Sequence, residues 1–297
     1  MILPNFLIIG AGKAGTTSVY HYLRQHPEVF VSPIKEPAFF VWEGQSQDLI
    51  PAWRMPVRSL AAYAALFDGV RHEKAIGEAS PTYLVDPRAA ARIRHRLPQA
   101  RLIAILRDPV ERAFSSYCMH LRDGRERRSF EQAVADELLD WPCRSRIQPH
   151  RSYLWYGLYA HHLGPYLTLF ERSQLKICLF DDLAADPPGF MRQLFRFLEV
   201  DDGFVPRTAV RYNASGLPQH RLLGPLLNKS ALTRTLRRLL PEPLRRRGAL
   251  IQEILRSRQM SKPPVPPELR RRLVALYRSD ILALQDLIDR DLARWLA

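Results

Sequence analysis

The sequence is poor in cysteine and has no long apolar run. Its three cysteines, Cys118, Cys143 and Cys178, are odd in number and widely spaced, which favours reduced thiols over a disulfide scaffold. Its nine histidines show no metal-ligand spacing with them, so we expect no metal. No stretch approaches the roughly 18–20 apolar residues of a membrane span, and no secretory signal pattern precedes the first apolar segment. These absences favour a cytoplasmic globular protein.

Positive charge is in excess. The chain carries 44 Lys and Arg against 30 Asp and Glu, a net charge of +14. Such an excess favours an anionic partner, which includes a nucleotide, an acidic glycan, nucleic acid or an acidic membrane. An arginine-rich composition can also arise without any such partner, so charge alone does not choose among these classes.

Strand patterns alternate with helical patterns along the first two thirds of the chain. Strands are expected at 5–10, 74–77, 101–106 and 175–180, followed by helices that end near 26 and that cover 87–97, 109–121 and 188–198. This order predicts an α/β fold, a single P-loop-like domain across 1–297 with a central parallel sheet flanked by helices. We expect a core at 5–200, a basic loop or lid at 201–267, and two amphipathic C-terminal helices at 268–297, the second starting near Ile281.

The stretch GAGKAGTTS, residues 10–18, follows the first strand directly. A glycine-rich turn at this place points backbone N–H groups and a helix N-terminus at an anion, and the hydroxyl groups of Thr16 and Thr17 add donors. A nucleoside-triphosphate loop has its lysine directly after the last glycine, whereas here Thr16 takes that place and Lys13 lies inside the loop. The pattern therefore indicates an anion site that is not built for a triphosphate with magnesium, although a simple connecting turn is the alternative.

A second polar cluster follows the strand at 101–106. Arg107 falls at the carboxyl end of that strand, where doubly wound sheets bind ligands, and Ser115 lies two turns into the next helix. Asp108, Pro109 and Glu111 read as the N-cap, first residue and capping-box acid of this helix. The alternative is that Arg107 only pairs with Asp108 or Glu111.

The two segments together resemble the phosphosulfate loop and the 3′-phosphate strand–helix of sulfotransferases that use 3′-phosphoadenosine 5′-phosphosulfate (PAPS), in particular the heparan-sulfate type and its bacterial relatives. The resemblance extends through KEPAFF (35–40), GEASPTYL (77–84) and 156–187, and so covers about 5–200. It implies PAPS as the donor and adenosine 3′,5′-bisphosphate (PAP) as the product. The donor-binding residues that it implies are Lys13, Ala14, Gly15, Thr16, Thr17, Ser18, Arg107 and Ser115.

The resemblance also gives the displaced lysine a chemical role. PAPS has no β,γ-phosphate pair, so Lys13 is expected to stabilise the charge that develops on the bridging oxygen as the sulfuryl group leaves. The family's base is a glutamate before paired aromatics, which corresponds to Glu36 ahead of Phe39 and Phe40. Glu78, at a strand end on the same sheet edge, is the second candidate. The family's lysine after that glutamate is replaced by Ala79, so the resemblance does not carry over a second catalytic cation or heparan specificity.

The C-terminal third adds further candidates. Arg211 and Arg221 lie where the family closes a loop over the nucleotide, and a solvated loop would explain them as well. Leucines and arginines crowd 222–247, which predicts either a lid that packs over the acceptor site or a peripheral membrane contact. The break at 241–243 by proline, glutamate and proline favours the lid.

The sequence is therefore compatible with three functions. The first is PAPS-dependent transfer to a hydroxyl or amine of a carbohydrate, a lipid-linked sugar or another metabolite, without a metal. The second is a P-loop nucleotide kinase or NTPase, which the displaced Lys13 argues against. The third is a non-catalytic protein that binds anions or nucleic acid, and we expect no nucleic-acid partner because base-stacking aromatic motifs are lacking.

Overall fold

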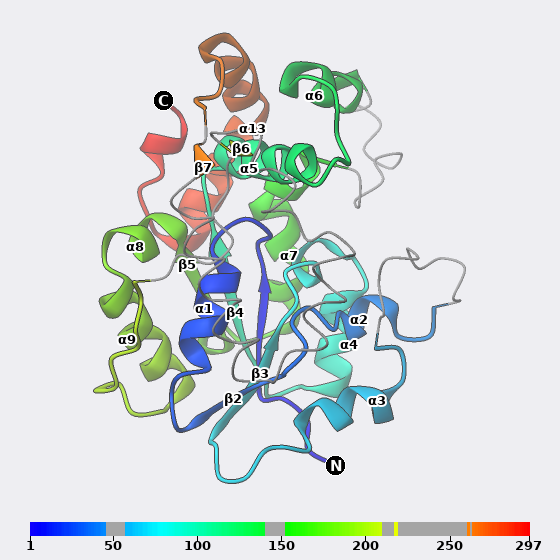
Figure 1. Ribbon diagram of the computed structural model, residues 1–297, viewed down its shortest axis with the longest axis vertical. Helices are drawn as coiled ribbons and strands as arrows, with labels where there is room; N and C mark the ends of the chain where they lie inside the picture. The colour runs from blue at the N-terminus through cyan, green and yellow to red at the C-terminus, as the bar shows by residue number, and fades with distance from the viewer. Residues whose placement is uncertain (46–56, 140–151, 210–216, 219–259, 262) are drawn as a thin grey trace.

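The protein, described by a computed structural model at residues 1–45, 57–139, 152–209, 217–218, 260–261 and 263–297, is built on a five-stranded sheet (Figure 1). The strands run parallel in the order β2-β3-β1-β4-β5. Their bounds are Phe6–Gly10 for β1, Val29–Val31 for β2, Ala75–Ala79 for β3, Arg101–Leu106 for β4 and Leu175–Leu179 for β5. The predicted central parallel sheet is therefore confirmed, with β2 as a short edge strand that the sequence analysis missed.

Helices cover both faces of the sheet. Helices α1 and α9 lie together on one side, and α4 and α7 lie together on the other (Figure 1). The helices in chain order are α1 (Thr16–Leu23), α2 (Phe39–Trp42), α3 (Leu60–Ala64), α4 (Ala89–Arg96), α5 (Pro109–Arg122), α6 (Phe130–Leu139), α7 (Tyr159–Leu169), α8 (Phe180–Ala185), α9 (Pro187–Leu198) and α13 (Pro267–Ile288). Short 3₁₀ turns occur at Ala65–Phe67, Tyr83–Val85, Trp155–Gly157, Arg172–Gln174 and Ala293–Trp295, and an antiparallel pair joins β6 (Leu217–Pro218) to β7 (Met260–Ser261).

The central strand β1 is apolar on both faces because helices cover both. Residues 6–9 are wholly buried, which accounts for an apolar run without alternation. Neighbouring β3 carries Gly77 opposite Phe6, and a Cβ on that glycine would come within 2.4 Å of the Phe6 ring. A glycine is therefore required there for the two strands to pack.

The carboxyl ends of β1 and β4 lie side by side and point toward α5 (Figure 1). The loop after β1 and Arg107 after β4 therefore meet at one edge, as expected for ligand sites in doubly wound sheets. Tyr159, at the start of α7, donates a hydrogen bond of 2.8 Å to the Arg107 carbonyl and fixes the backbone there.

The C-terminal segment is one long helix and not the two helices that the sequence suggested. Helix α13 runs unbroken from Pro267 to Ile288, because the stretch near 278–281 contains neither glycine nor proline and its apolar spacing continues through Ile281. It ends where Asp289 takes a left-handed conformation, and only a 3₁₀ turn follows. The helix packs against α7 and α5, and the Tyr277 hydroxyl donates a 2.7 Å hydrogen bond to the Leu154 carbonyl.

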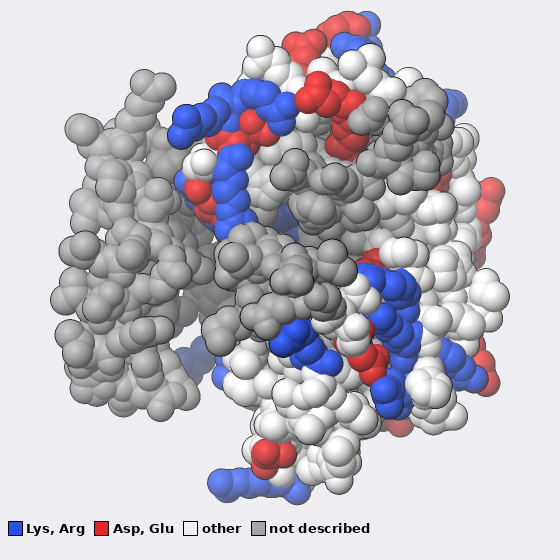
Figure 2. Space-filling model, turned by 90° about the vertical axis from the view of Figure 1, so that its right-hand side faces the viewer, with Lys and Arg blue, Asp and Glu red and all other residues white. Residues whose placement is uncertain are grey.

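The described residues carry only part of the protein's net positive charge. Lys and Arg side chains are interspersed with Asp and Glu on the face in Figure 2, and many form ion pairs, such as Arg96 with Glu43 at 2.6 Å. In the sequence, residues 219–259 contain ten Lys and Arg against two Asp and Glu. More than half of the net charge of +14 therefore belongs to that segment, which is the larger part of the basic loop or lid predicted at 201–267 and lies outside the described residues.

The packing of α13 makes a stability prediction. Leu273 is wholly buried, so Leu273→Ala is expected to lower the free energy of unfolding by about 2–5 kcal/mol through lost burial and a cavity. Leu282 on the same helix is 39% exposed, and Leu282→Ala is the matched control, with an expected effect within about 1 kcal/mol. Urea unfolding followed by circular dichroism measures both, and equal losses would contradict the packed position of α13.

Candidate active site

The loop between β1 and α1 is held in place by backbone contacts and by close packing. The Ala11 N–H donates to the Ile105 carbonyl of β4 at 2.7 Å. Gly15 has φ 88°, and a Cβ there would lie 2.8 Å from the Leu183 side chain. Glycine is thus needed at the turn into α1, both for its backbone conformation and for space.

The first turn of α1 is suited to an anion. Like every α-helix it begins with N–H groups that have no intrahelical acceptor, and no acidic residue lies in this turn. Thr16 and Ser18 are buried, and Thr17 is half-buried. The sequence-predicted residues from Lys13 to Ser18 therefore surround one helix N-terminus.

Lys13 extends along α5. Its carbonyl accepts a hydrogen bond of 3.3 Å from the Arg107 guanidinium, and its Nζ lies 3.5 Å from the Met119 sulfur. The pKa of Lys13 is lowered to about 8, first by burial and then by the positive charges of Arg122 and Arg107, while Asp123 and Glu36 oppose the shift. An anion bound beside Lys13 would relieve the repulsion that destabilises its charged form.

Arg107 is oriented by three neighbours. Its guanidinium lies 4.6 Å from the Phe180 ring centre and 3.6 Å from a Glu111 carboxylate oxygen, in addition to its bond to the Lys13 carbonyl. Burial lowers its pKa, so the charged form again lacks full solvation. The fold thus brings together Arg107 and Lys13, two predicted site residues that lie 94 positions apart in the sequence.

Helix α5 contributes more than the sequence analysis expected. Ser115, a predicted site residue, is fully buried on it. Met119 and Arg122 follow at spacings of four and three residues and thus share the Ser115 face. Met119 contacts the Lys13 amine and the charge of Arg122 repels it, and the sequence analysis named neither residue. Helical periodicity from Ser115 was the available signal.

Glu36 lies at the surface end of the same edge. Its N–H donates to the Ala79 carbonyl at the end of β3, and its carboxylate pairs with Lys35 at 2.5 Å. Its side chain is 39% exposed and near enough to Lys13 to raise the pKa of that amine. Its backbone has φ 61°, a left-handed conformation that is uncommon for a residue with a side chain. Such positions are frequent at active sites.

Glu78, the second candidate base, is wholly buried in a hydroxyl network. It accepts hydrogen bonds from Tyr83 (2.6 Å), Ser80 (2.8 Å) and Tyr63 (3.3 Å). Burial raises its pKa to about 7 although these bonds favour the charged form. The Ser80 hydroxyl also accepts from the Ala38 N–H at 3.0 Å, so Glu78 supports the loop that carries Glu36.

Two further predicted residues, Arg211 and Arg221, lie outside the described residues. In the described part of the chain, no three His, Cys, Asp or Glu side chains form a group able to hold a metal ion. None of the helices described there combines the length and apolar character needed to cross a bilayer. That no metal takes part in the reaction stays a prediction.

Comparison with known proteins identifies the family. A model described as the sulfotransferase family matches residues 4–203, so this chain belongs to that family. A sulfotransferase from Alicyclobacillus acidocaldarius of known crystal structure is 32% identical and superposes with a TM-score of 0.75 over the whole of both chains. The predicted family and α/β fold are thus confirmed.

Two named relatives act on sugars according to their names. Carbohydrate sulfotransferase 15 of Mus musculus is 29% identical over 283 residues, which cover 75% of this chain and 49% of the relative. Heparan sulfate glucosamine 3-O-sulfotransferase 3A1 of Mus musculus is 33% identical over 198 residues, which cover 66% and 46%. The chain spans about half the length of the curated relatives it matches.

The lowered pKa of Lys13 predicts a change in stability. At pH 7 the folded state holds a poorly solvated ammonium group, so Lys13→Met is expected to raise the free energy of unfolding by about 1–3 kcal/mol. Between the folded pKa of about 8 and the ordinary lysine pKa of 10.5, the unfolded chain binds the proton that the folded chain has released. Wild-type stability therefore rises with pH in that window, and the advantage of the variant disappears.

Denaturant titrations at pH 7 and pH 10 measure this difference. Lys74→Met is the control, because the Lys74 side chain is 63% exposed. A Lys13→Met variant that is no more stable than the Lys74→Met variant at pH 7 would show that the Lys13 ammonium is well solvated.

Proposed function

We propose that this chain transfers the sulfuryl group of PAPS to a hydroxyl or amine of a carbohydrate, a lipid-linked sugar or another metabolite. The observation that carries the proposal is the convergence of Lys13 and Arg107, two poorly solvated cations, at an α1 N-terminus without acidic residues. Membership of the sulfotransferase family supports the same reaction.

The residues present fit a donor with anionic groups at two places. The N–H groups and hydroxyls at 16–18, with Lys13, suit the 5′-phosphosulfate. Arg107 and Ser115 suit the 3′-phosphate, since a guanidinium binds phosphate oxygens with directed donors. On binding the donor, the poorly solvated cations Lys13 and Arg107 would gain charge-assisted hydrogen bonds to its anionic oxygens. These bonds are the expected source of donor affinity.

In the proposed reaction, each residue has one task. We assign to the Lys13 ammonium the stabilisation of the oxygen that gains charge as the S–O bond to the 5′-phosphate breaks. Glu36, a surface-accessible carboxylate, takes the proton from the acceptor oxygen or nitrogen as that atom attacks sulfur. Glu78 has no exposed surface, and we assign it to the support of the Glu36 loop.

The acceptor proposal follows the relatives. The names of the two mouse relatives refer to carbohydrate and to heparan sulfate, which supports a sugar as the acceptor class. We keep the cytoplasm as the proposed location, with peripheral membrane contact as the alternative. A P-loop kinase is disfavoured because Lys13 lies inside the loop and Thr16 takes the place directly after the last glycine.

The function is tested first by ligand selectivity. Isothermal titration calorimetry should show micromolar or tighter binding of PAP, and ATP with Mg²⁺ should bind at least about 10-fold more weakly, a difference of about 1.4 kcal/mol. Transfer of labelled sulfate from PAPS is then followed over glycans, lipid-linked sugars and small phenols. Preference for ATP with Mg²⁺ would favour the kinase alternative, and tight binding of random nucleic acid that PAP does not affect would favour the non-catalytic one.

The assignment of the base is tested by isosteric variants. Glu36→Gln keeps the shape but removes the basicity, so turnover is expected to fall by about 10²–10⁴ with little change in PAP affinity. Glu78→Gln is the matched variant, for which we expect a lower melting temperature and a smaller loss of turnover. Steady-state transfer rates and PAP titrations measure both, and an active Glu36→Gln beside an inactive Glu78→Gln would move the base to Glu78.

A further inference from the structure

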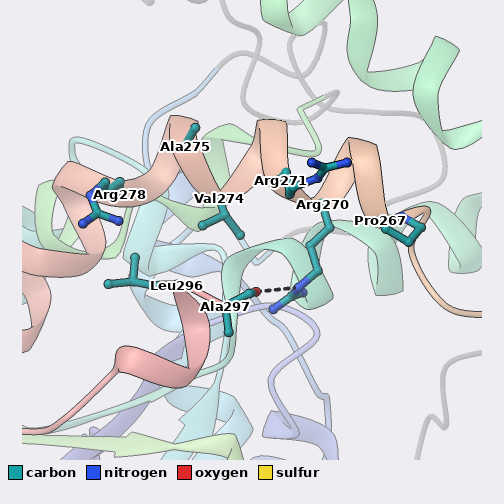
Figure 3. Close-up of a pocket in the computed structure, with 8 residues that line it drawn as sticks. All are labelled: Pro267, Arg270, Arg271, Val274, Ala275, Arg278, Leu296 and Ala297. Carbon is teal, nitrogen blue, oxygen red and sulfur yellow. Dashed lines mark hydrogen bonds between the residues drawn. The ribbon is translucent and has the colours of Figure 1, made fainter.

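Arg270 connects the C-terminal helix α13 to the start of α5. Its guanidinium lies 2.8 Å from an Asp108 carboxylate oxygen and 3.8 Å from a Glu111 oxygen, and it donates a 3.0 Å hydrogen bond to the Ala297 carbonyl. Figure 3 shows the side chain directed from α13 toward Ala297, beside a cavity of about 470 Å³. The side chain is 25% exposed, so this contact is largely shielded from water.

The two carboxylates that Arg270 contacts flank Arg107. Asp108 follows it directly, and its other oxygen caps α5 by accepting from the N–H groups of Val110 and Glu111 at 2.9 and 3.0 Å. Glu111 lies between two guanidinium groups, with one oxygen 3.6 Å from Arg107 and the other 3.8 Å from Arg270. The start of α5 thus holds two negative and two positive charges in contact.

Without Arg270 this cluster would carry one net negative charge at the place where Arg107 is proposed to meet a phosphate. A carboxylate only a few ångströms from a bound phosphate disfavours it strongly when both are shielded from water. The uncompensated carboxylates would also hold Arg107 more firmly in ion pairs. Both effects act on the 3′-phosphate and spare the 5′-side of the nucleotide.

We propose that Arg270 is a positioning residue for the donor site, which neutralises Asp108 and Glu111 so that Arg107 is available to the 3′-phosphate. The inference rests on the proposed use of PAPS. It assigns to α13 a role in donor selectivity in addition to its role in packing.

Binding of PAP and of adenosine 5′-phosphate, which lacks the 3′-phosphate, provides the test. Calorimetry on the full chain compares wild type with Arg270→Met, Arg270→Lys and Arg271→Met. Arg271 is the matched control because it is the next residue on α13, is 77% exposed and pairs with Glu268. Thermal melting is recorded for every variant.

We expect Arg270→Met to weaken PAP about 10-fold or more, the effect of roughly one uncompensated charge in a shielded site, and to leave adenosine 5′-phosphate within about twofold. Arg270→Lys should recover part of the loss, and Arg271→Met should change neither ligand. Adding Asp108→Asn to Arg270→Met should restore PAP affinity, because asparagine removes the charge and still caps the helix.

Different failures are distinguishable. If wild type does not prefer PAP to adenosine 5′-phosphate, the proposed function itself is wrong. If wild type shows the preference but Arg270→Met weakens both ligands equally, or if Asp108→Asn brings no recovery, Arg270 is a structural residue and the inference is overturned. A lost ion pair that merely loosens the fold would lower the melting temperature in both variants, without recovery of PAP affinity in the double variant.

Discussion

The site depends on positive charges that are gathered at one sheet edge and that water does not fully solvate. The pKa of Lys13 falls to about 8, chiefly through burial and in addition through the positive charges of Arg122 and Arg107. The carboxylates of Asp123 and Glu36 offset the repulsion only in part. Such an arrangement costs folding free energy and is typical of positions that are completed by a ligand of opposite charge. The sheet edge and α5 hold the cations together against this repulsion.

A second principle is that polar residues beneath the site hold the loops above it. The buried Glu78 accepts a hydrogen bond from the Ser80 hydroxyl, which in turn accepts one from the Ala38 N–H in the loop that carries Glu36. Buried networks of this kind are rigid when all their members are paired. In the same way, Asp108 joins a helix cap to an ion pair with α13. Residues without a proposed role in the reaction, such as Glu78 and Asp108, thus hold in place the segments that carry Glu36 and Arg107.

Much of this could be predicted from the sequence, for physical reasons that also explain the misses. The loop at 10–18 and Arg107 follow apolar strands, so their meeting at one sheet edge could be inferred from alternation alone. Strand β2 has only three residues and carries too little pattern to be recognised. Met119 and Arg122 share the Ser115 face by helical periodicity, but that periodicity does not show that Lys13 lies along α5, so the two residues were missed. The contact of Arg270 with Asp108 joins residues 162 positions apart and could not be read from either segment.

The extension of Lys13 along α5 has a consequence for how such a protein can diverge. One helix presents Arg107 before its first turn and Met119 and Arg122 near its end. A single inserted or deleted residue between them would rotate the far end by about 100°, since an α-helix has 3.6 residues per turn. It would also move Met119 and Arg122 out of position relative to the Lys13 side chain. Changes of chain length that adapt the protein to new acceptors must therefore fall in the connecting segments, while α5 can change only by substitution.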